Sequence, residues 1–375
     1  MSDANLAHRA AIRRVAIVAP VAAAFLDELS PLVGRLLAGR HRVFCLAPDL
    51  DEATAQALAY RGADSAALPI TPERWSLLPE RKLVGELAGR LSAWQADVMF
   101  AAGGDTIARA AAAASKAQIE TIVVLADRVG LDTGSANRRV LERACQKATG
   151  ILCHNHDDAA RLEISGLCPP ALPPPAVLPG FGVDLSQFDM ISLPPLTNGL
   201  TFLMVADLDR ARGVLDFAAA ASLAKAQAPQ ARFLLLHRPA RSDDPVHEDE
   251  LVPFADAIEI VRPGTSISDA LMHAHVFVYP SHAEAMPQRV LEALATARPV
   301  ITTATPGCRE TVDERVNGVL VPPGDKGALA RALGSFLKRP DLIPAMARAS
   351  RQKAERRFDR SLAMDATLAV LGLDE

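Results

Sequence analysis

The feature that most constrains this chain is an alternation of short apolar runs with longer amphipathic stretches, which occurs twice along the sequence. Short runs rich in Val, Ile and Leu are typical of buried parallel strands, and amphipathic stretches between them are typical of helices that cover such a sheet. The sequence therefore predicts an α/β protein with two Rossmann-like, doubly wound domains. The predicted strands are 15–20, 42–47, 98–101, 121–125, 150–154, 200–205, 233–236, 258–261, 276–279, 300–303 and 319–321, and the predicted helices include 22–37, 106–116, 287–296 and 342–358.

A proline-rich stretch separates the two halves. Residues 169–179 are rich in proline, and Pro194 and Pro195 follow. Proline ends helices and is excluded from inner strands, so this stretch marks a connector between domains. We expect an N-terminal domain of residues 1–184 and a C-terminal domain of residues 185–358. A last helix, 360–373, is expected to pack back on the first domain.

Composition excludes several classes of protein. The formal net charge is −4 and aromatic residues make up 4% of the chain, which argues against nucleic acid as a partner. The five cysteines include no Cys-x-x-Cys pair, which favours reduced thiols in a cytoplasmic protein. Residues 15–26 follow Arg13 and Arg14 as in a signal peptide, but a first strand running into a helix is the favoured interpretation. No apolar run reaches the roughly 18 residues of a membrane-spanning helix.

The most informative segment for function is 276–295. A buried strand ends at Pro280, the next loop carries Glu284, and a helix is predicted to begin near Pro287. The first N–H groups of a helix lack intrahelical partners and form an anion site. Glu292 lies eight residues after Glu284, about two helical turns, and so on roughly the side of the helix entrance. Two carboxylates flanking a phosphate site can bind hydroxyls at both ends of a ligand; a solvated helix with two unrelated glutamates is the alternative.

Further blocks follow in order: a turn of Thr-Pro-Gly-Cys-Arg-Glu at 305–310, and Val-Asn-Gly-Val-Leu-Val-Pro-Pro-Gly-Asp at 316–325. Before them, 178–188 reads Leu-Pro-Gly-Phe-Gly-Val-Asp-Leu-Ser-Gln-Phe. Together with Glu284 and Glu292, which fit a Glu-x7-Glu motif, these blocks resemble the C-terminal domain of family 4 retaining glycosyltransferases. The resemblance covers roughly residues 198–360. It implies the GT-B fold, in which two Rossmann-like domains face each other across a cleft.

The resemblance also implies an activity: transfer of a sugar from a UDP- or GDP-sugar to a glycan or lipid-linked envelope precursor, with retention and without a metal or other cofactor. Glu284 would be a catalytic residue that contacts the donor sugar, and Glu292 would hold the ribose. A non-catalytic relative that binds a nucleotide sugar or a protein partner, and a nucleotide-sugar epimerase, stay open as alternatives. The further donor-binding residues would be Ala285, Met286 and Pro287 at the diphosphate, Ile260 and Val261 at the base, and Gly307 in the following turn.

The sequence departs from the family at the diphosphate. The stretch after the first strand of the second half is Ala-Asp-Leu-Asp-Arg-Ala-Arg-Gly. Arg212 replaces the family's lysine, but Asp207 occupies the position of its arginine, and a carboxylate there repels a diphosphate. Arg210 is a second candidate for this role. Ala285 replaces a glycine, which narrows the approach of the backbone.

The first half lacks the histidine that usually lines the family's cleft. Asp127, our second catalytic candidate, and the acceptor-side candidates Asp105 and Arg128 are polar residues at strand ends. Gly103 and Gly104 form either an anion-binding loop or a simple turn. His154 and His156 allow three interpretations: metal ligands, a helix cap formed with Asp157 or Asp158, or part of the cleft wall. A basic run at 348–357 leaves peripheral contact with the inner membrane open, with a solvated helix face favoured.

Overall fold

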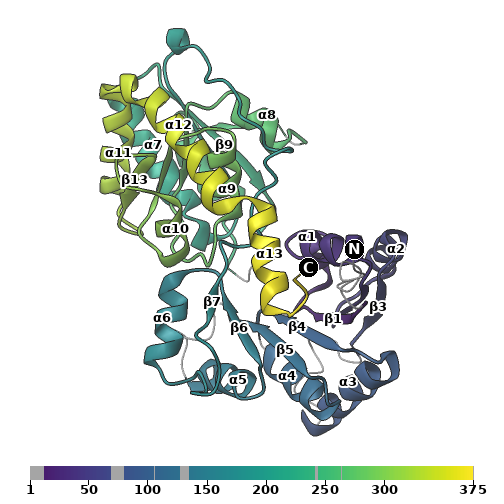
Figure 1. Ribbon diagram of the computed structural model, residues 1–375. Coiled ribbons are helices and arrows are strands. Elements are labelled where there is room, and N and C mark those ends of the chain that lie inside the picture. Colours follow the sequence, from purple (N-terminus) through teal and green to yellow (C-terminus); the bar gives the residue numbers. More distant parts are fainter. Residues whose placement is uncertain are drawn as a thin grey trace, which may run out of the picture. The chain divides into compact units, whose positions relative to one another are not determined.

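The structure is a computed structural model that describes residues 12–68, 80–104, 106–126, 135–240, 244–262 and 264–374. Contacts divide the chain into two units (Figure 1). The first unit consists of Met1–Phe181 and Ser361–Glu375, and the second of Gly182–Arg360. Each unit has its own parallel sheet and its own hydrophobic core.

The first unit is built on a seven-stranded sheet with the order β3-β2-β1-β4-β5-β6-β7, in which each described strand pair is parallel. Alternate residues of β1 face opposite sides: Val15 and Ile17 join one buried cluster, and Ala16 and Val18 join another. Both faces are therefore covered, which explains the continuous apolar runs. The strands are β1 (Arg14–Val18), β2 (Arg42–Ala47), β3 (Asp64–Ala67), β4 (Val98–Ala102), β5 (Thr121–Leu125), β6 (Gly150–Cys153) and β7 (Ala176–Val177).

The helices of the first unit follow its strands in turn. They are α1 (Ser30–Ala38), α2 (Glu52–Arg61), α3 (Glu80–Trp94), α4 (Thr106–Lys116), α5 (Ser135–Cys145) and α6 (His156–Ile164), together with the C-terminal α13 (Arg360–Val370). Helix α13 is drawn in yellow in Figure 1. Its residues Ala363, Met364 and Leu368 belong to the same buried cluster as Val15 and Ile17.

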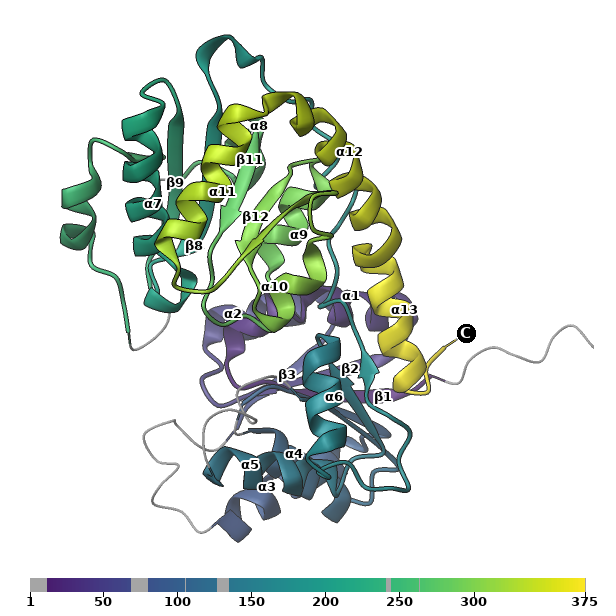
Figure 2. The ribbon, with the colours of Figure 1, turned by 90° about the vertical axis from the view of Figure 1, so that its left-hand side faces the viewer.

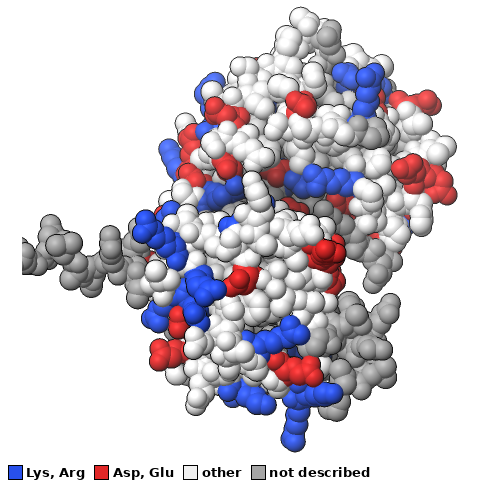
Figure 3. Space-filling view, turned by 90° about the vertical axis from the view of Figure 1, so that its right-hand side faces the viewer, with Lys and Arg blue, Asp and Glu red and all other residues white. Residues whose placement is uncertain are grey.

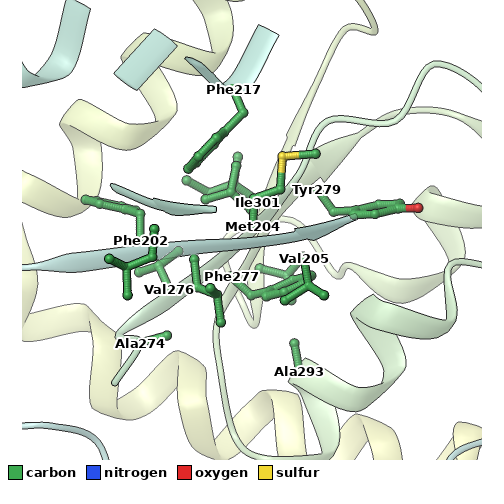
Figure 4. Close-up of a cluster of buried hydrophobic side chains, with 14 of the residues drawn as sticks. Phe202, Met204, Val205, Phe217, Ala274, Val276, Phe277, Tyr279, Ala293 and Ile301 are labelled. Atoms are coloured by element: carbon green, nitrogen blue, oxygen red, sulfur yellow. The ribbon is translucent and has the colours of Figure 1, made fainter. Parts of the chain in front are cut away.

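The second unit has a six-stranded sheet with the order β10-β9-β8-β11-β12-β13, again parallel in each described pair. Its core gathers around β8 and β11. Phe202 and Ile301 face Phe217 of α7 on one side of the sheet, and Phe277 faces Ala293 of α9 on the other side (Figure 4). The elements are β8 (Thr201–Asp207), α7 (Val214–Gln227), β9 (Arg232–Arg238), β10 (Glu259–Ile260), α8 (Ile267–Met272), β11 (Val276–Tyr279), α9 (Gln288–Ala295), β12 (Val300–Thr303), α10 (Pro306–Thr311), β13 (Gly318–Val321), α11 (Lys326–Lys338) and α12 (Ile343–Lys353).

Some sequence predictions were wrong in detail. The helix predicted for 22–37 is broken: a short 3-10 turn, Ala22–Phe25, precedes α1, whose first turn contains Pro31. Proline lacks the N–H that would continue a preceding helix, which explains the new start. The turn predicted for 305–310 contains a short helix, α10. The helix predicted for 342–358 does run to Phe358, but its last part, Ala354–Phe358, is a π-helix that follows α12 without a break. Strands β3 and β7 were missed, because their sequences, DSAA and AV, carry little apolar signal.

The first segment of the second unit, which precedes β8, is held in place by a buried arginine. Arg298 is fully buried and donates to the carbonyl oxygens of Ile191 at 2.7 Å, Ser192 at 3.2 Å and Leu271 at 3.0 Å. Burial lowers the pKa of Arg298 to about 10. Because carbonyl oxygens satisfy its donors, this buried cation joins the segment around Ile191 to Leu271 of α8.

The charged surface gives no sign of a polyanion site on the face shown in Figure 3. There, Lys and Arg side chains are interspersed with Asp and Glu over the described residues. Within the described parts of the chain, no helix is long and apolar enough to cross a membrane.

Candidate functional site

The site in the second unit begins at the loop that follows β8. This loop ends at Gly213, whose φ is +76°, in the left-handed region that favours glycine. A Cβ at Gly213 would lie 2.1 Å from the carbonyl oxygen of Pro280, the residue after β11. The loop after β8 therefore packs directly on the end of β11, and only a glycine fits at the contact.

Glu284 receives two hydrogen bonds at the end of β11. Arg212, on the loop after β8, donates from Nη1 to Glu284 Oε2, and the Tyr279 hydroxyl donates to the same oxygen at 3.0 Å. The Glu284 side chain is 16% exposed and that of Arg212 is 30% exposed. The carboxylate is thus held in place from two strands, at an edge that solvent still reaches.

Several charged side chains act on the hydroxyl group of Tyr279. Its ring packs in the core of the unit, and its hydroxyl oxygen is directed away from the apolar cluster (Figure 4). Burial raises the pKa of the Tyr279 hydroxyl above its ordinary range. The cations Arg212 and Arg289 act against that rise, whereas Asp207 adds to it. Arg212, Arg289 and Asp207 are therefore close enough to the Tyr279 hydroxyl to act on its pKa.

Glu292, the second glutamate of the motif, is 4% exposed in α9. Arg289 of the same helix donates to both of its carboxylate oxygens, at 2.7 and 3.0 Å. The solvated helix face that we considered as an alternative is therefore wrong for Glu292. The helix begins at Gln288, one residue later than predicted, with Pro287 as its N-cap.

The loop between β11 and α9, which carries Glu284, is fixed by the segments that follow the neighbouring strands. The N–H of His282 donates to the carbonyl oxygen of Ala211 at 2.8 Å, and that of Gly307 donates to Glu284 O at 3.1 Å. A Cβ at Gly307 would lie 2.2 Å from Ala285 O. The start of α10 therefore packs against the backbone at Ala285, so Gly307 is required for close approach.

The structure adds an ion cluster that the sequence did not point to. His282 Nε2 lies 2.5 Å from Asp216 Oδ2 in the first turn of α7, and Lys326 Nζ of α11 lies 3.8 Å from Asp216 Oδ1. No spacing in the sequence marks these residues as partners, since they belong to three separate loop–helix junctions. Together they connect the loop that carries Glu284 to α7 and α11.

The other residues predicted to bind the donor, Arg210, Ile260 and Val261, have different contacts in the second unit. Arg210 contacts Glu250 through two hydrogen bonds, at 3.0 and 3.1 Å, and Asp244 at 3.2 Å. These hydrogen bonds raise the pKa of the Arg210 guanidinium. Ile260, the last residue of β10, is 49% exposed, and the N–H of the following Val261 donates to Leu235 O of the neighbouring strand β9. Arg212 thus contacts Glu284, whereas Arg210 contacts Glu250 and Asp244 instead.

In the first unit, Gly103 and Gly104 connect β4 to α4. Their φ angles are +63° and +61°, both in the region that favours glycine. The Thr106 hydroxyl donates to Gly103 O at 2.9 Å, which closes the turn into α4. The conformation of this loop requires both glycines, in an anion-binding loop as in a simple turn. The candidates Asp105, Asp127 and Arg128 lie outside the described residues.

His154 and His156 occupy different environments after β6. His154 contacts Phe181 edge to face, with ring centroids 5.6 Å apart, and burial lowers its pKa to about 4. His156 is exposed and is the first residue of α6. The helix cap predicted at Asp157 or Asp158 is instead Asn155, whose side chain accepts the Asp158 N–H at 2.8 Å. No group of three metal-ligating side chains occurs among the residues that the structure describes.

Comparison with known proteins finds similarity to glycosyltransferases. Residues 199–339 match the family model described as "Glycosyl transferases group 1". The chain is 28% identical over 216 residues to the glycogen synthase of Mycobacterium tuberculosis (strain CDC 1551 / Oshkosh), over 56% of this chain and 50% of that protein. It is 29% identical over 196 residues to the putative colanic acid biosynthesis glycosyltransferase WcaL of Escherichia coli (strain K12), over 48% and 47%. The chain thus spans about half the length of the curated relatives it matches.

Solved structures extend the likeness to both units. Alr3699/HepE of Anabaena in complex with UDP aligns with a TM-score of 0.78 and 18% identity, over 96% of this chain and 99% of that chain. The same protein has been solved with UDP-glucose, and that structure aligns with a TM-score of 0.76. At this level of identity the likeness shows the fold, which is that of GT-B proteins.

Proposed function

We propose that this chain is a glycosyltransferase that moves a sugar from a UDP- or GDP-sugar to a glycan or lipid-linked acceptor, with retention at the anomeric carbon. The observation that carries the proposal is the meeting of Arg212 and Glu284 beside the start of α9, within the segment that matches the family model. The UDP and UDP-glucose bound to Alr3699/HepE favour a uridine donor among the two.

The diphosphate would lie between Arg212 and the first turn of α9. A guanidinium and free helical N–H groups both stabilise phosphate oxygens, by charge-assisted hydrogen bonds and by the helix dipole. Because Arg212 also pairs with Glu284, the incoming diphosphate would share or replace the carboxylate. Glu284, released or reoriented, would then accept hydrogen bonds from hydroxyls of the donor sugar.

Two further roles, binding of the ribose and attack with retention, would fall to Glu292 and to the diphosphate of the donor. Glu292 would accept hydrogen bonds from the ribose hydroxyls, with Arg289 holding its carboxylate in place. For retention, the acceptor hydroxyl would attack from the face of the leaving diphosphate, whose oxygen takes the proton. No metal or other cofactor is part of the proposal, since Arg212 and the α9 N–H groups would neutralise the leaving group.

A second candidate is a relative that binds a nucleotide sugar without turnover. Asp207 favours it, since this carboxylate acts on Tyr279 together with Arg212 and so lies near the proposed diphosphate position. A negative charge there opposes the second negative charge that develops on a departing nucleoside diphosphate. Binding and turnover therefore have to be measured separately.

The test is a panel of UDP, GDP and their hexose conjugates, each followed by the thermal unfolding midpoint and by release of free nucleotide. A ligand that binds only the folded state raises the midpoint. A transferase gives both a shift and release that depends on Glu284. A shift without release in the presence of varied glycan acceptors supports the non-catalytic relative. No shift with any nucleotide contradicts both.

Arg212→Ala is the variant that ties this binding to the site. It should remove the nucleotide-induced shift, whereas the matched control Arg232→Ala should keep it. Arg232 is also ion-paired, to Glu259 at 2.5 Å, but on β9 and β10. If the nucleotide raises the unfolding midpoint of Arg212→Ala as much as that of the wild type, the nucleotide binds at another part of the chain.

A further inference from the structure

The second unit has a cavity of about 700 Å³ at the outer edge of its sheet. This volume lies within the range of small-molecule sites, roughly 300–1,000 Å³. Edge strand β13 forms one wall, and α11 and α12 form the others (Figure 2 labels both helices). None of the residues placed at the proposed nucleotide site lines it. Its walls are mainly apolar and include Val319, Val321, Phe336, Leu342, Met346 and Ala349.

Arginine side chains also line this cavity. Arg315, Arg331 and Arg339 contribute to the lining, and Glu314 is its one acidic member. Arg339 pairs with Asp341 at 2.7 Å, and Arg331 lies 4.0 Å from Asp325 with a side chain that is 76% exposed. Within the described part of the chain, Arg315 takes part in no ion pair. The cavity therefore combines apolar walls with a surplus of positive charge.

The edge of β13 is closed to an added strand. Glu314 accepts a hydrogen bond from the outward N–H of Leu320 at 2.8 Å. The carbonyl oxygen of Gly318 accepts one from the Arg315 N–H at 2.8 Å. Backbone groups that would pair with a partner strand are thus used within the chain. Glu314 keeps its negative charge, but the three arginines of the lining outnumber it, so the cavity favours an anionic ligand.

We propose that this cavity binds an amphiphile with a single aliphatic chain and an anionic head, namely a long-chain carboxylate in solution. Each methylene of the chain that leaves water strengthens binding about fourfold. The head binds Arg315 and Arg331, because a guanidinium forms two parallel hydrogen bonds to a carboxylate. This site is independent of the proposed sugar transfer.

The experiment is calorimetric titration of the full chain with monomeric dodecanoate, with dodecyl maltoside and butanoate as the comparison ligands. Dodecanoate should bind at one site per chain. Dodecyl maltoside has the tail without the charge, and butanoate has the charge with a short tail, so each should bind at least tenfold more weakly. Equal binding of dodecanoate and dodecyl maltoside overturns the role of the arginines. Binding to phosphatidylglycerol vesicles without binding of dodecanoate overturns the proposal in favour of a membrane surface.

Variants of the residues that line the cavity test whether the ligand binds there. Arg315→Gln and Arg331→Gln should each weaken dodecanoate about tenfold, since each removes a charge-assisted hydrogen bond. Ala349→Phe should block binding by filling the cavity. Arg348→Gln is the matched control, because Arg348 is an exposed residue of α12 outside the lining. Circular dichroism and thermal unfolding should show that each variant is folded. Undiminished binding in folded Ala349→Phe would overturn the proposal, as would equal losses in Arg348→Gln and Arg315→Gln.

Discussion

Arg212 donates a hydrogen bond to Glu284, 72 residues further along the chain. The pairing arises because β8 and β11 are neighbours in the sheet, so the loops that follow them lie at the same edge. Both side chains are only partly exposed, which makes the pair a fixed feature of the edge rather than a transient surface contact. A diphosphate that binds Arg212 must compete with this carboxylate.

Replacement of Glu284 by Ala should reduce sugar transfer by about a hundredfold or more, a loss typical of a group that stabilises a transition state. Nucleotide release with the active donor measures the loss. Circular dichroism should show a folded chain, since the side chain lies at the sheet edge. The matched control is Glu259→Ala, which removes another ion pair of the same unit. Equal rates for Glu284→Ala and the wild type would refute the assigned role.

Asp207→Asn should strengthen binding of the nucleotide sugar about tenfold, because it removes a negative charge near the proposed diphosphate position. The Kd from titration at low ionic strength measures the change, which should shrink as salt is added. The control is Asp244→Asn, at an exposed residue that pairs with Arg210. Affinity that is unchanged in Asp207→Asn would show that this carboxylate does not oppose the ligand.

Gly213→Ala should lower the free energy of unfolding by about 2–4 kcal/mol, because it adds both backbone strain and a clash with Pro280 O. Urea unfolding measures the effect. Gly334→Ala is the matched control: Gly334 lies within α11, and its added methyl would meet no atom within 4 Å. That variant should be more stable by about 0.4–1 kcal/mol, since alanine favours helices. Similar effects at the two glycines would contradict the packing described for Gly213.

Arg298→Met should destabilise the second unit by about 3–5 kcal/mol, because it leaves buried carbonyl oxygens without a donor. The segment around Ile191 and Ser192 should become sensitive to protease, since Arg298 holds it. Limited proteolysis with mapping of the cut sites measures this. Arg348→Met, at an exposed residue, should keep the wild-type pattern. Protection of the segment in Arg298→Met would show that other contacts hold it.

His154 should make the first unit less stable in acid. Burial lowers its pKa from 6.5 to about 4, so between these values the unfolded chain binds a proton that the folded chain does not. Stability from this group is therefore present above pH 6.5 and is lost as the pH falls toward 4, at roughly 1.4 kcal/mol per pH unit at most. His154→Gln should flatten that part of the profile in urea unfolding at pH 7 and pH 4.5. Parallel profiles for the two proteins would exclude His154 as the source.

Local sequence was informative where burial is regular. The strands around Val15–Val18 and Val276–Tyr279 are apolar at every position because both faces of each sheet are covered, so a short window suffices to find them. It failed for β3 and β7, the outer strands of the first sheet, which have fewer apolar residues. It also missed Asn155 as the cap of α6, because Asp157 and Asp158 are equally good capping residues.

The sequence by itself determined that the chain forms two sets of parallel strands and covering helices, because hydrophobic periodicity is a local property. It also indicated Glu284 and Arg212 as separate candidates for a phosphate-binding site. Only the tertiary structure decided which charges meet. Arg212 pairs with Glu284 while Arg210, two residues earlier, pairs with Glu250. Ion pairs depend on distances of a few ångströms, and those distances are set by the order of strands in the sheet rather than by their order in the chain.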